Sequence, residues 1–388
     1  MKKKMALPSF ASLLIVLLAA AFLFAAARIY VCSDGISEDS SATAYTRYER
    51  GKVTQILADS TTQSPVDDGG WRGQQLLLVK VITGEYKGEV LQVYNYVGPI
   101  YDGPVKVGDH VVLNISVYED GSHIATVQYF DRLIPFAVLI GVFLLVTVLI
   151  GGKTGAKSLV GLLVTLATLF YILLPALFKG ADTILAVLLA SSYIAVVSLC
   201  IMSGTKRKTW CAIGGTIAGV ALAAVLGLIA QSMAHIDGLQ AEDAEALLQI
   251  RQTGGSIRLS GLLVGGFILS ALGAVMDVTM GIASSISEIH DANPDMGAKE
   301  LFRSGMNVGR DMVGTMTNTL ILAFLGSSFS VILYVYSISL QPYYLISSPF
   351  VTIEVLSSLS SSIGVILSIP ITAGLTALAL GARRKAKK

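Results

Sequence analysis

The stretch from Ser260 to Leu325 decides the fold: it reads SGLLVGGFILSALGAVMDVTMGIASSISEI (260–289) and, after a short polar break, RSGMNVGRDMVGTMTNTLILAFL (303–325). Each part contains an apolar run typical of a membrane-spanning helix. Asp277 lies inside the first run. A charge at the centre of a bilayer costs at least about 2.5 to 3.5 kcal/mol on insertion scales, so an acidic residue here indicates a specific role.

Small and polar residues of the first run recur every three or four positions and therefore share one face of a helix. This stripe consists of Ser270, Gly273, Asp277, Gly281, Ser284 and Glu288. Because apolar residues surround it, we expect the stripe to face protein or water rather than lipid, with its small residues allowing close helix packing.

The second run carries a similar stripe at Asn307, Asp311, Thr315 and Asn318. Two polar faces in adjacent helices are predicted to pair, with Thr315 and Asn318 beside Asp277. One hypothesis is that Asp277 takes up protons or cations and couples this uptake to movement. The alternative is that it only makes a structural hydrogen bond to a threonine or asparagine of the second run.

The composition is that of an integral membrane protein. Of 388 residues, 53% are hydrophobic and 14% are charged, whereas soluble proteins have about 25% charged residues. Apolar runs predict about eight transmembrane helices. The runs are residues 10–27, 133–150, 159–178, 183–202, 211–233, 260–286, 312–337 and 349–380.

The N-terminal residues 1–31 fit either an anchor helix or a secretory signal. Three lysines precede the apolar run, and Ala25, Ala26 and Ala27 would permit cleavage. The run continues past Arg28 through Ile29, Tyr30 and Val31, which favours an uncleaved anchor.

Residues 33–132 have the composition of a small soluble domain, with 8 basic and 14 acidic residues. Five segments rich in Val, Ile, Tyr and Leu lie between turn residues and predict short strands, at 48–58, 74–83, 88–96, 110–117 and 124–130. We expect a small all-β, OB-like domain. It could bind a ligand or a partner, or serve only as a folded spacer.

The distribution of Lys and Arg predicts the topology of the remaining seven-helix bundle, residues 133–388. With eight spans, one side of the membrane carries 16 basic residues and the short loops of the other carry 3. The positive-inside rule then makes both termini cytoplasmic and residues 33–132 extracytoplasmic.

The last run places Glu354, Ser357, Ser361, Gly364 and Ser368 along one face, so Glu354 is either a second coupling carboxylate or a hydrated residue at the membrane interface. Gly215 and Gly219, like Gly261 and Gly265, have the spacing that lets helices approach closely. The four histidines are scattered and predict no metal site. No nucleophile and base are placed for catalysis, so we do not expect an enzyme. We also expect no cofactor and no nucleic-acid partner.

Three long segments resemble the YibE/F-like family of bacterial multi-pass membrane proteins. They are GAVMDVTMGIASSISEI (273–289), KELFRSGMNVGRDMVGTMTNTLILAFLG (299–326) and VLSSLSSSIGVILSIPITA (355–373). The stretch VKVITGEYKGEV (79–90) is similar to the extracytoplasmic part of that family. The resemblance implies a bacterial plasma-membrane protein, and the family has no assigned molecular function.

The last three runs are also similar, more distantly, to the end of the SecD/SecF proton-driven export accessories, which have an acidic helix, a Thr/Asn-rich helix and a Ser-Pro helix. The chain departs from them in its number of runs and its smaller external domain. We therefore expect an ion-coupled transporter or export accessory, with protons or cations and a small solute or exported polypeptide as partners beside the lipid bilayer. The alternative is an envelope scaffold or sensor whose β domain binds a partner. Either could form oligomers.

Overall fold

The computed structural model describes residues 43–65, 69–118, 122–237, 247–248, 256, 258–259, 261–338 and 341–381. The chain forms two compact units, one spanning Ser37–Val146 and one that includes Thr147–Lys388. The predicted domain boundary at 132/133 falls earlier than this division, at the start of a helix that begins in the first unit and ends in the second. The predicted anchor or signal at residues 1–31 lies outside the described residues.

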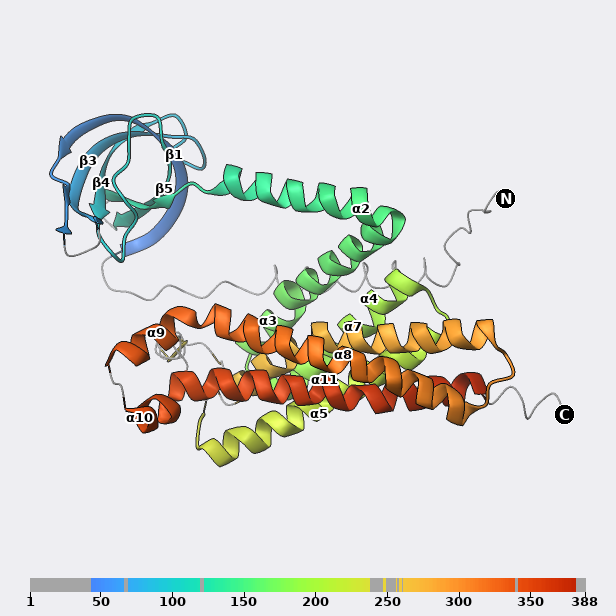
Figure 1. Cartoon of the computed structure of the whole chain (residues 1–388). Helices are drawn as coiled ribbons and strands as arrows, with labels where there is room; N and C mark the ends of the chain where they lie inside the picture. Colours follow the sequence, from blue (N-terminus) through green and yellow to red (C-terminus); the bar gives the residue numbers. More distant parts are fainter. Residues whose placement is uncertain are drawn as a thin grey trace. The chain divides into compact units, whose positions relative to one another are not determined.

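The first unit contains a small β-barrel, as the sequence predicts. Its strands are β1 (Thr43–Asp59), β2 (Thr62–Gln63), β3 (Trp71–Val81), β4 (Val90–Val97), β5 (His110–Tyr118) and β6 (His123–Phe130). The strand order β1-β5-β6-β4-β3 closes because β3 also pairs with β1, and β2 extends only β3. Figure 1 shows the curled sheet. All pairs are antiparallel except β4–β6, which gives the five-stranded closed order of an OB-fold.

Alternation along the strands builds the barrel core. In β4, every second residue is buried and the others are exposed, the pattern of a strand with one face on a core. The residues that fill the barrel are mainly β-branched or leucine, as strand propensity favours. They include Val53, Leu77, Val79, Val93, Val111, Leu113 and Ile115.

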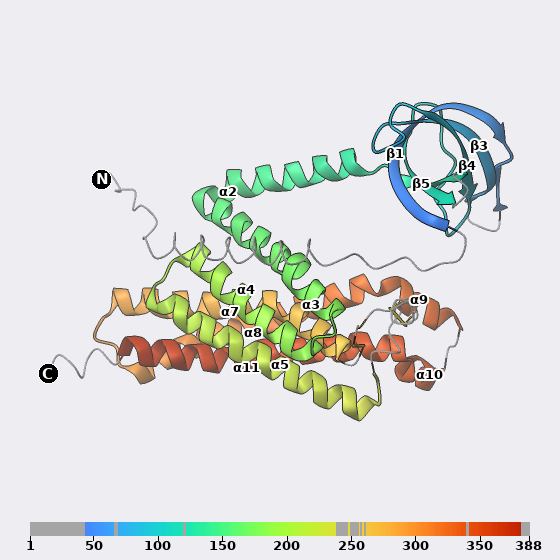
Figure 2. The ribbon, with the colours of Figure 1, turned by 180° about the vertical axis from the view of Figure 1, so that it is seen from behind.

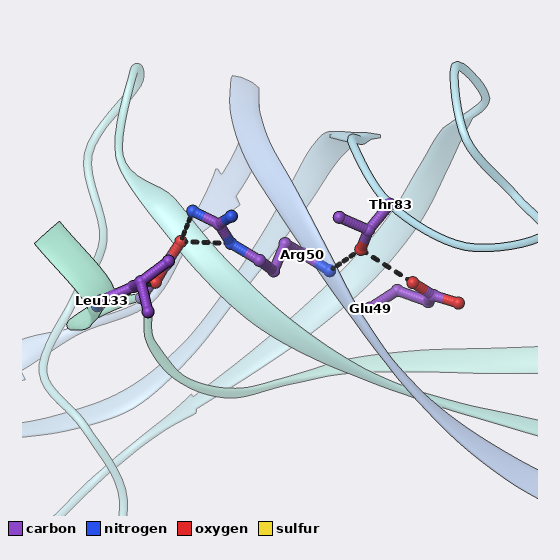
Figure 3. Close-up of polar contacts among 5 residues, drawn as sticks. Glu49, Arg50, Thr83 and Leu133 are labelled. Carbon is purple, nitrogen blue, oxygen red and sulfur yellow. Dashed lines mark hydrogen bonds and ion pairs between the residues drawn. The ribbon is translucent and has the colours of Figure 1, made fainter. Parts of the chain in front are cut away.

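A network of hydrogen bonds connects β1 to the chain just before the first helix (Figure 3). Arg50 donates from Nε to Asp131 Oδ2 at 2.7 Å, and Asp131 Oδ1 accepts the backbone N–H of Leu133 at 3.0 Å. The backbone N–H of Arg50 donates to Thr83 Oγ1 at 2.8 Å, and the Thr83 hydroxyl donates to Glu49 at 2.8 Å. The buried Asp131 side chain therefore joins the barrel to the helix start.

We predict that this network makes the β domain sensitive to acid. Burial opposes ionisation of Asp131, but the Leu133 N–H and the Arg50 guanidinium outweigh burial and hold its pKa below the usual value. A carboxyl with a lowered folded pKa stabilises the domain above its unfolded pKa of about 3.9, and this contribution disappears as the pH falls through the folded pKa.

The test is urea denaturation of a fragment of residues 40–136, followed by circular dichroism from neutral to acidic pH. We expect Asp131→Asn to lose about 1 kcal/mol at neutral pH and to show a flatter loss of stability in acid. Asp109→Asn is a matched change on the same domain, at a carboxylate that accepts only the Lys106 N–H. Parallel acid profiles for wild type and Asp131→Asn would contradict this account.

The second unit is helical, and its first helix begins in the first unit. The helices are α2 (Leu133–Thr168), the π-helix η2 (Leu169–Leu173), α3 (Leu174–Phe178), α4 (Thr183–Ser203), α5 (Arg207–Ala234), α7 (Leu262–Ala292), α8 (Ala298–Ser327), α9 (Phe329–Ile338), α10 (Pro342–Ser347) and α11 (Pro349–Gly381). Asp182 caps α4 by accepting the Leu185 N–H at 3.0 Å.

Five helical segments of the described chain are long and apolar enough to cross a membrane: Leu133–Phe178, Thr183–Ser203, Arg207–Ala234, Leu262–Ala292 and Pro349–Gly381. The pair α8 and α9, bent by 63°, makes a sixth if it is one span. The predicted number of about eight is therefore not confirmed. The run at 10–27 lies outside the described residues, and those at 133–150 and 159–178 fall within a single segment.

Gly152 divides that single segment. Its backbone has φ 52° and ψ −132°, outside the helical region and available to glycine at little steric cost. The 46 residues of Leu133–Phe178 would measure roughly 69 Å as a continuous helix, about twice a hydrocarbon core of roughly 30 Å. The segment is therefore two helical pieces joined by a kink at Gly152 rather than one continuous helix.

Helices α5, α7 and α11 form the closely packed centre of the second unit, with α4 and α8 packed against them (Figures 1 and 2). Glycines set the approach of α5 to α11. A Cβ built at Gly364 would lie 2.6 Å from the Ala223 Cβ, and one at Gly219 would lie 2.7 Å from the Ser368 Cβ. The predicted close approach at Gly219 is confirmed.

The neighbouring glycines act similarly. A Cβ at Gly215 would overlap the Thr372 hydroxyl of α11, and one at Gly265 would lie 3.3 Å from Thr183 and Val187 of α4. Gly261 instead precedes α7 with φ 84°, in the left-handed region. Small residues thus permit the helix contacts that the glycine spacing predicts.

Candidate functional site

Asp277 is the midpoint of α7, Leu262–Ala292. The stripe that contains it contacts neighbouring helices on either side of Asp277. Ser270 and Ser361 of α11 share a hydrogen bond of 3.0 Å, and a Cβ at Gly281 would lie 3.2 Å from the Met312 Cε of α8. Between these contacts, Gly273 has no neighbour within 4 Å of a built Cβ, and Asp277 is exposed. The helix packing therefore leaves this part of the stripe uncovered.

No hydrogen bond or ion pair joins Asp277 to another residue of the described chain. Of the remaining stripe members, Ser284 is half-buried and Glu288 is exposed near the end of α7. A carboxylate in the middle of an apolar helix without a partner is costly in a bilayer.

The predicted partners on α8 lie at the correct level but do not bind Asp277. Gly281 faces Met312, and α8 runs antiparallel to α7, since Gly309 faces Ile282 and Gly305 faces Ile286. One turn from this contact are Asp277 on α7 and Thr315 on α8. The Thr315 hydroxyl donates to the Met312 carbonyl at 3.0 Å.

Asn318 lies about one further turn along α8, and its side chain is exposed, as are those of Asn307 and Asp311. The polar face predicted for α8 therefore exists, but no described residue of another helix forms a hydrogen bond with it. Thr319 donates back to the Thr315 carbonyl at 2.8 Å, within the same helix.

Glu354 lies far from Asp277. Helices α7 and α11 are parallel, because Ser270 pairs with Ser361 while a built Gly215 Cβ touches both Thr279 and Thr372. Glu354 is seven residues before Ser361, and Asp277 is seven residues after Ser270. At 1.5 Å per residue the two carboxylates are separated by roughly 20 Å along the bundle. They do not form one site.

A buried hydroxyl pair behind the stripe was not predicted. Thr216 of α5 and Thr279 of α7 are both buried, and their hydroxyl oxygens lie 2.8 Å apart. The hydroxyl that does not donate to the other threonine can donate to a carbonyl of its own helix, Thr216 to Ala212 at 2.9 Å or Thr279 to Met276 at 3.1 Å. The sequence offered one hint of this pair, because Thr216 directly follows Gly215 between the two closely spaced glycines 215 and 219. The pair holds α5 to α7 on the side of α7 opposite Asp277.

A family profile of YibE/F-like proteins matches residues 139–382, which contain α3 to α11 and most of α2. The chain belongs to the YibE/F-like protein family. Comparisons with curated proteins and with solved structures find no match.

The resemblance seen in the sequence is thereby confirmed for the helices. In this YibE/F-like protein the three long motifs lie on α7, on α8 and on α11, the helices that meet around the stripe. The stretch 79–90 in the barrel lies outside the matched range.

An open cavity of about 490 Å³ lies where α5 ends and α7 begins. Its lining consists of Ile184, Leu228, Gln231, Ser232, His235, Ile236, Asp237 and Gly261. The Gln231 Oε1 is buried without a hydrogen-bond partner among the described residues. Gly261 precedes Asp277 by 16 positions, roughly 24 Å of helix, so the cavity is at the end of the bundle and does not reach the carboxylate. Within the described chain, no cluster of three or more His, Cys, Asp or Glu could hold a metal ion.

Proposed function

We propose that this YibE/F-like protein is an ion-coupled transporter or export accessory in which Asp277 binds and releases a proton or cation. One observation carries the proposal: Asp277 is central in an apolar helix and has no hydrogen bond or ion pair within the described chain. The purely structural alternative needs a bond to α8. Against this alternative, the Thr315 hydroxyl donates within its own helix, to the Met312 carbonyl.

The charged and the protonated forms of Asp277 are stable in different surroundings. The charged carboxylate requires hydrogen-bond donors or water, whereas the neutral acid tolerates apolar neighbours. Two side chains of α8 could donate to the charged form: Thr315 at the level of Asp277, if its hydroxyl leaves the Met312 carbonyl, and Asn318 about one turn further. Of the contacts between the two helices, the one nearest Asp277 is Met312 on Gly281, an unbranched, flexible side chain against a glycine. The two states of Asp277 therefore favour two positions of α8 against α7, which is how ion uptake is coupled to movement.

Reconstitution tests this proposal. The purified protein in liposomes that contain a pH-sensitive dye should move protons when a solute or peptide gradient is applied, and a panel of small solutes and unfolded peptides would define the substrate. Empty liposomes and liposomes with the Asp277→Asn protein serve as controls. Absence of ion flux with the whole panel, from a protein that is folded and oriented in both directions, would overturn transport as the function.

We also propose that the protein resides in the bacterial plasma membrane with both termini cytoplasmic and residues 33–132 outside, since 16 basic residues on one side face 3 in the short loops of the other. Reporter fusions test this. Fusions after Lys208 and after Lys388 should report a cytoplasmic position, and one after Asp120 an external position. An external signal after Lys208 would remove this topology.

A second candidate function is an envelope scaffold or sensor whose β domain binds a partner. It is favoured by the closed barrel, which has a core of its own, and by tyrosines that the barrel leaves exposed. If the Asp277→Asn protein functions as the wild-type protein does, this candidate is favoured over transport.

A further inference from the structure

Three tyrosines are exposed on the outer face of β4 and in the segment that follows it. Tyr94 and Tyr96 are 42% and 44% exposed, and they lie two residues apart on β4, about 7 Å along the strand. Tyr101, 55% exposed, lies against Tyr96 with ring centroids 6.1 Å apart and planes tilted by 40°. Three rings thus gather at one side of the barrel.

Uncharged amides and hydroxyls flank these rings. Gln74 lies opposite Tyr96, and Tyr94 lies between Leu76 of β3 and Thr126 of β6. Gln92, two residues before Tyr94, is exposed like Gln74. Neither of these glutamine side chains hydrogen-bonds another residue of the described chain. By contrast, the inward-facing Gln75 and Asn95 are buried and bonded to each other at 3.0 Å.

The central part of this face is uncharged, and the charged residues nearest to it, Lys80 and the Asp102–Arg132 ion pair, lie at its edges. The segments 74–78, 92–96 and 124–128 contain no Asp, Glu, Lys or Arg, and the region 33–132 as a whole has more acidic than basic residues. Nucleic-acid binding needs cations that neutralise phosphates, and single-stranded binding adds a positively charged groove. The face therefore lacks the chemistry for a polyanion, although β3 and β4 are the strands that correspond to the ligand-binding strands 2 and 3 of OB-folds.

We propose that this face, which we call the tyrosine face (Gln74, Gln92, Tyr94, Tyr96, Tyr101 and Thr126), binds a neutral oligosaccharide. The C–H hydrogens of a sugar ring carry partial positive charge and pack on the negative face of an aromatic ring. The glutamine amides and the threonine hydroxyl can donate to and accept from sugar hydroxyls. The binding belongs to the barrel alone, so it does not depend on transport by the helices.

The test uses the full chain in lipid nanodiscs, because the sugar headgroups of maltoside detergents would compete. Titration calorimetry with neutral oligomers of glucose and of N-acetylglucosamine should detect binding that changes little between about 50 and 200 mM salt. Tyr94→Ala and Tyr96→Ala should each weaken it about tenfold, the scale of one lost aromatic stack. Tyr96→Phe should retain most of it, because the ring remains.

Tyr48→Ala is the matched control: Tyr48 is 64% exposed on the part of β1 that pairs with Asn114 of β5, whereas β1 pairs with β3 only from Gly51 to Asp59. It should bind as wild type does. Three results would overturn the proposal: no binding of either neutral oligomer, tighter binding of oligothymidylate or an acidic peptide than of the neutral oligomers, or wild-type affinity in both Tyr94→Ala and Tyr96→Ala. Circular dichroism of each variant verifies that the exposed substitutions leave the barrel folded.

Discussion

Asp277→Asn is expected to abolish ion-dependent transport while the protein stays folded and inserted in the membrane. The amide has nearly the size of the carboxyl group and can form hydrogen bonds, but it cannot ionise. A proton or cation carried by Asp277 would then have no binding group, and ion flux into liposomes should fall to the level of empty vesicles. Expression and size-exclusion profiles should match those of wild type, because the described chain shows no hydrogen bond or ion pair of Asp277 for the substitution to break.

Three further variants separate a functional from a structural carboxylate. Asp277→Leu removes the cost of a charge in the bilayer, so a purely structural site would lose at most about 0.6 kcal/mol, typical of one interhelical hydrogen bond. Asp277→Glu keeps an ionisable group and should retain part of the flux with an altered pH dependence. Asp291→Asn makes the same chemical change at the exposed end of α7 and should be silent. Wild-type flux and pH dependence in Asp277→Asn would refute the coupling role.

The barrel could be predicted because its rules are local. Alternation of buried and exposed residues in Val90–Val97 is visible in the sequence, and the turns between strands have clear glycine signals. The five predicted strands correspond to β1, β3, β4, β5 and β6, and only the two-residue β2 was missed. Closure by the β1–β3 pairing depends on contacts distant in sequence, and the strand order was therefore not predictable from alternation.

The membrane bundle could be predicted only in part. Hydropathy identifies segments that avoid water, but it does not locate the bends in the helices they form. The non-helical dihedral angles of Gly152 and the 63° bend between α8 and α9 both lie inside or beside apolar runs. Helical spacing identified the face of α7 that holds Asp277 and Ser270, but it could not show that Asp277 has no partner. Thr279 was missed because a single hydroxyl in an apolar run resembles an ordinary packing residue.

Gly364→Leu is expected to disrupt the packing of the bundle strongly. A Cβ at this position would lie 2.6 Å from the Ala223 Cβ and 3.1 Å from the carbonyl oxygen of Gly219, so the obstacles are mostly backbone and a side chain that cannot rotate away. Overpacking in a filled core costs about 1 to 3 kcal/mol, and the upper end applies where a branched side chain meets backbone. Separation of α5 from α11 would also strain the Ser270–Ser361 and Thr216–Thr279 hydrogen bonds that hold α7.

The measurement is the thermal midpoint of the full chain in detergent, read by size-exclusion chromatography after heating. Gly374→Leu is the matched control on the same helix, because a Cβ there has no neighbour within 4 Å, and its midpoint should stay within a few degrees of wild type. Gly273→Ala, equally free of neighbours, should stabilise α7 slightly, by up to about 1 kcal/mol of helix propensity. If Gly364→Leu and Gly374→Leu had equal midpoints, the close crossing of α5 and α11 would not be what holds the three central helices together.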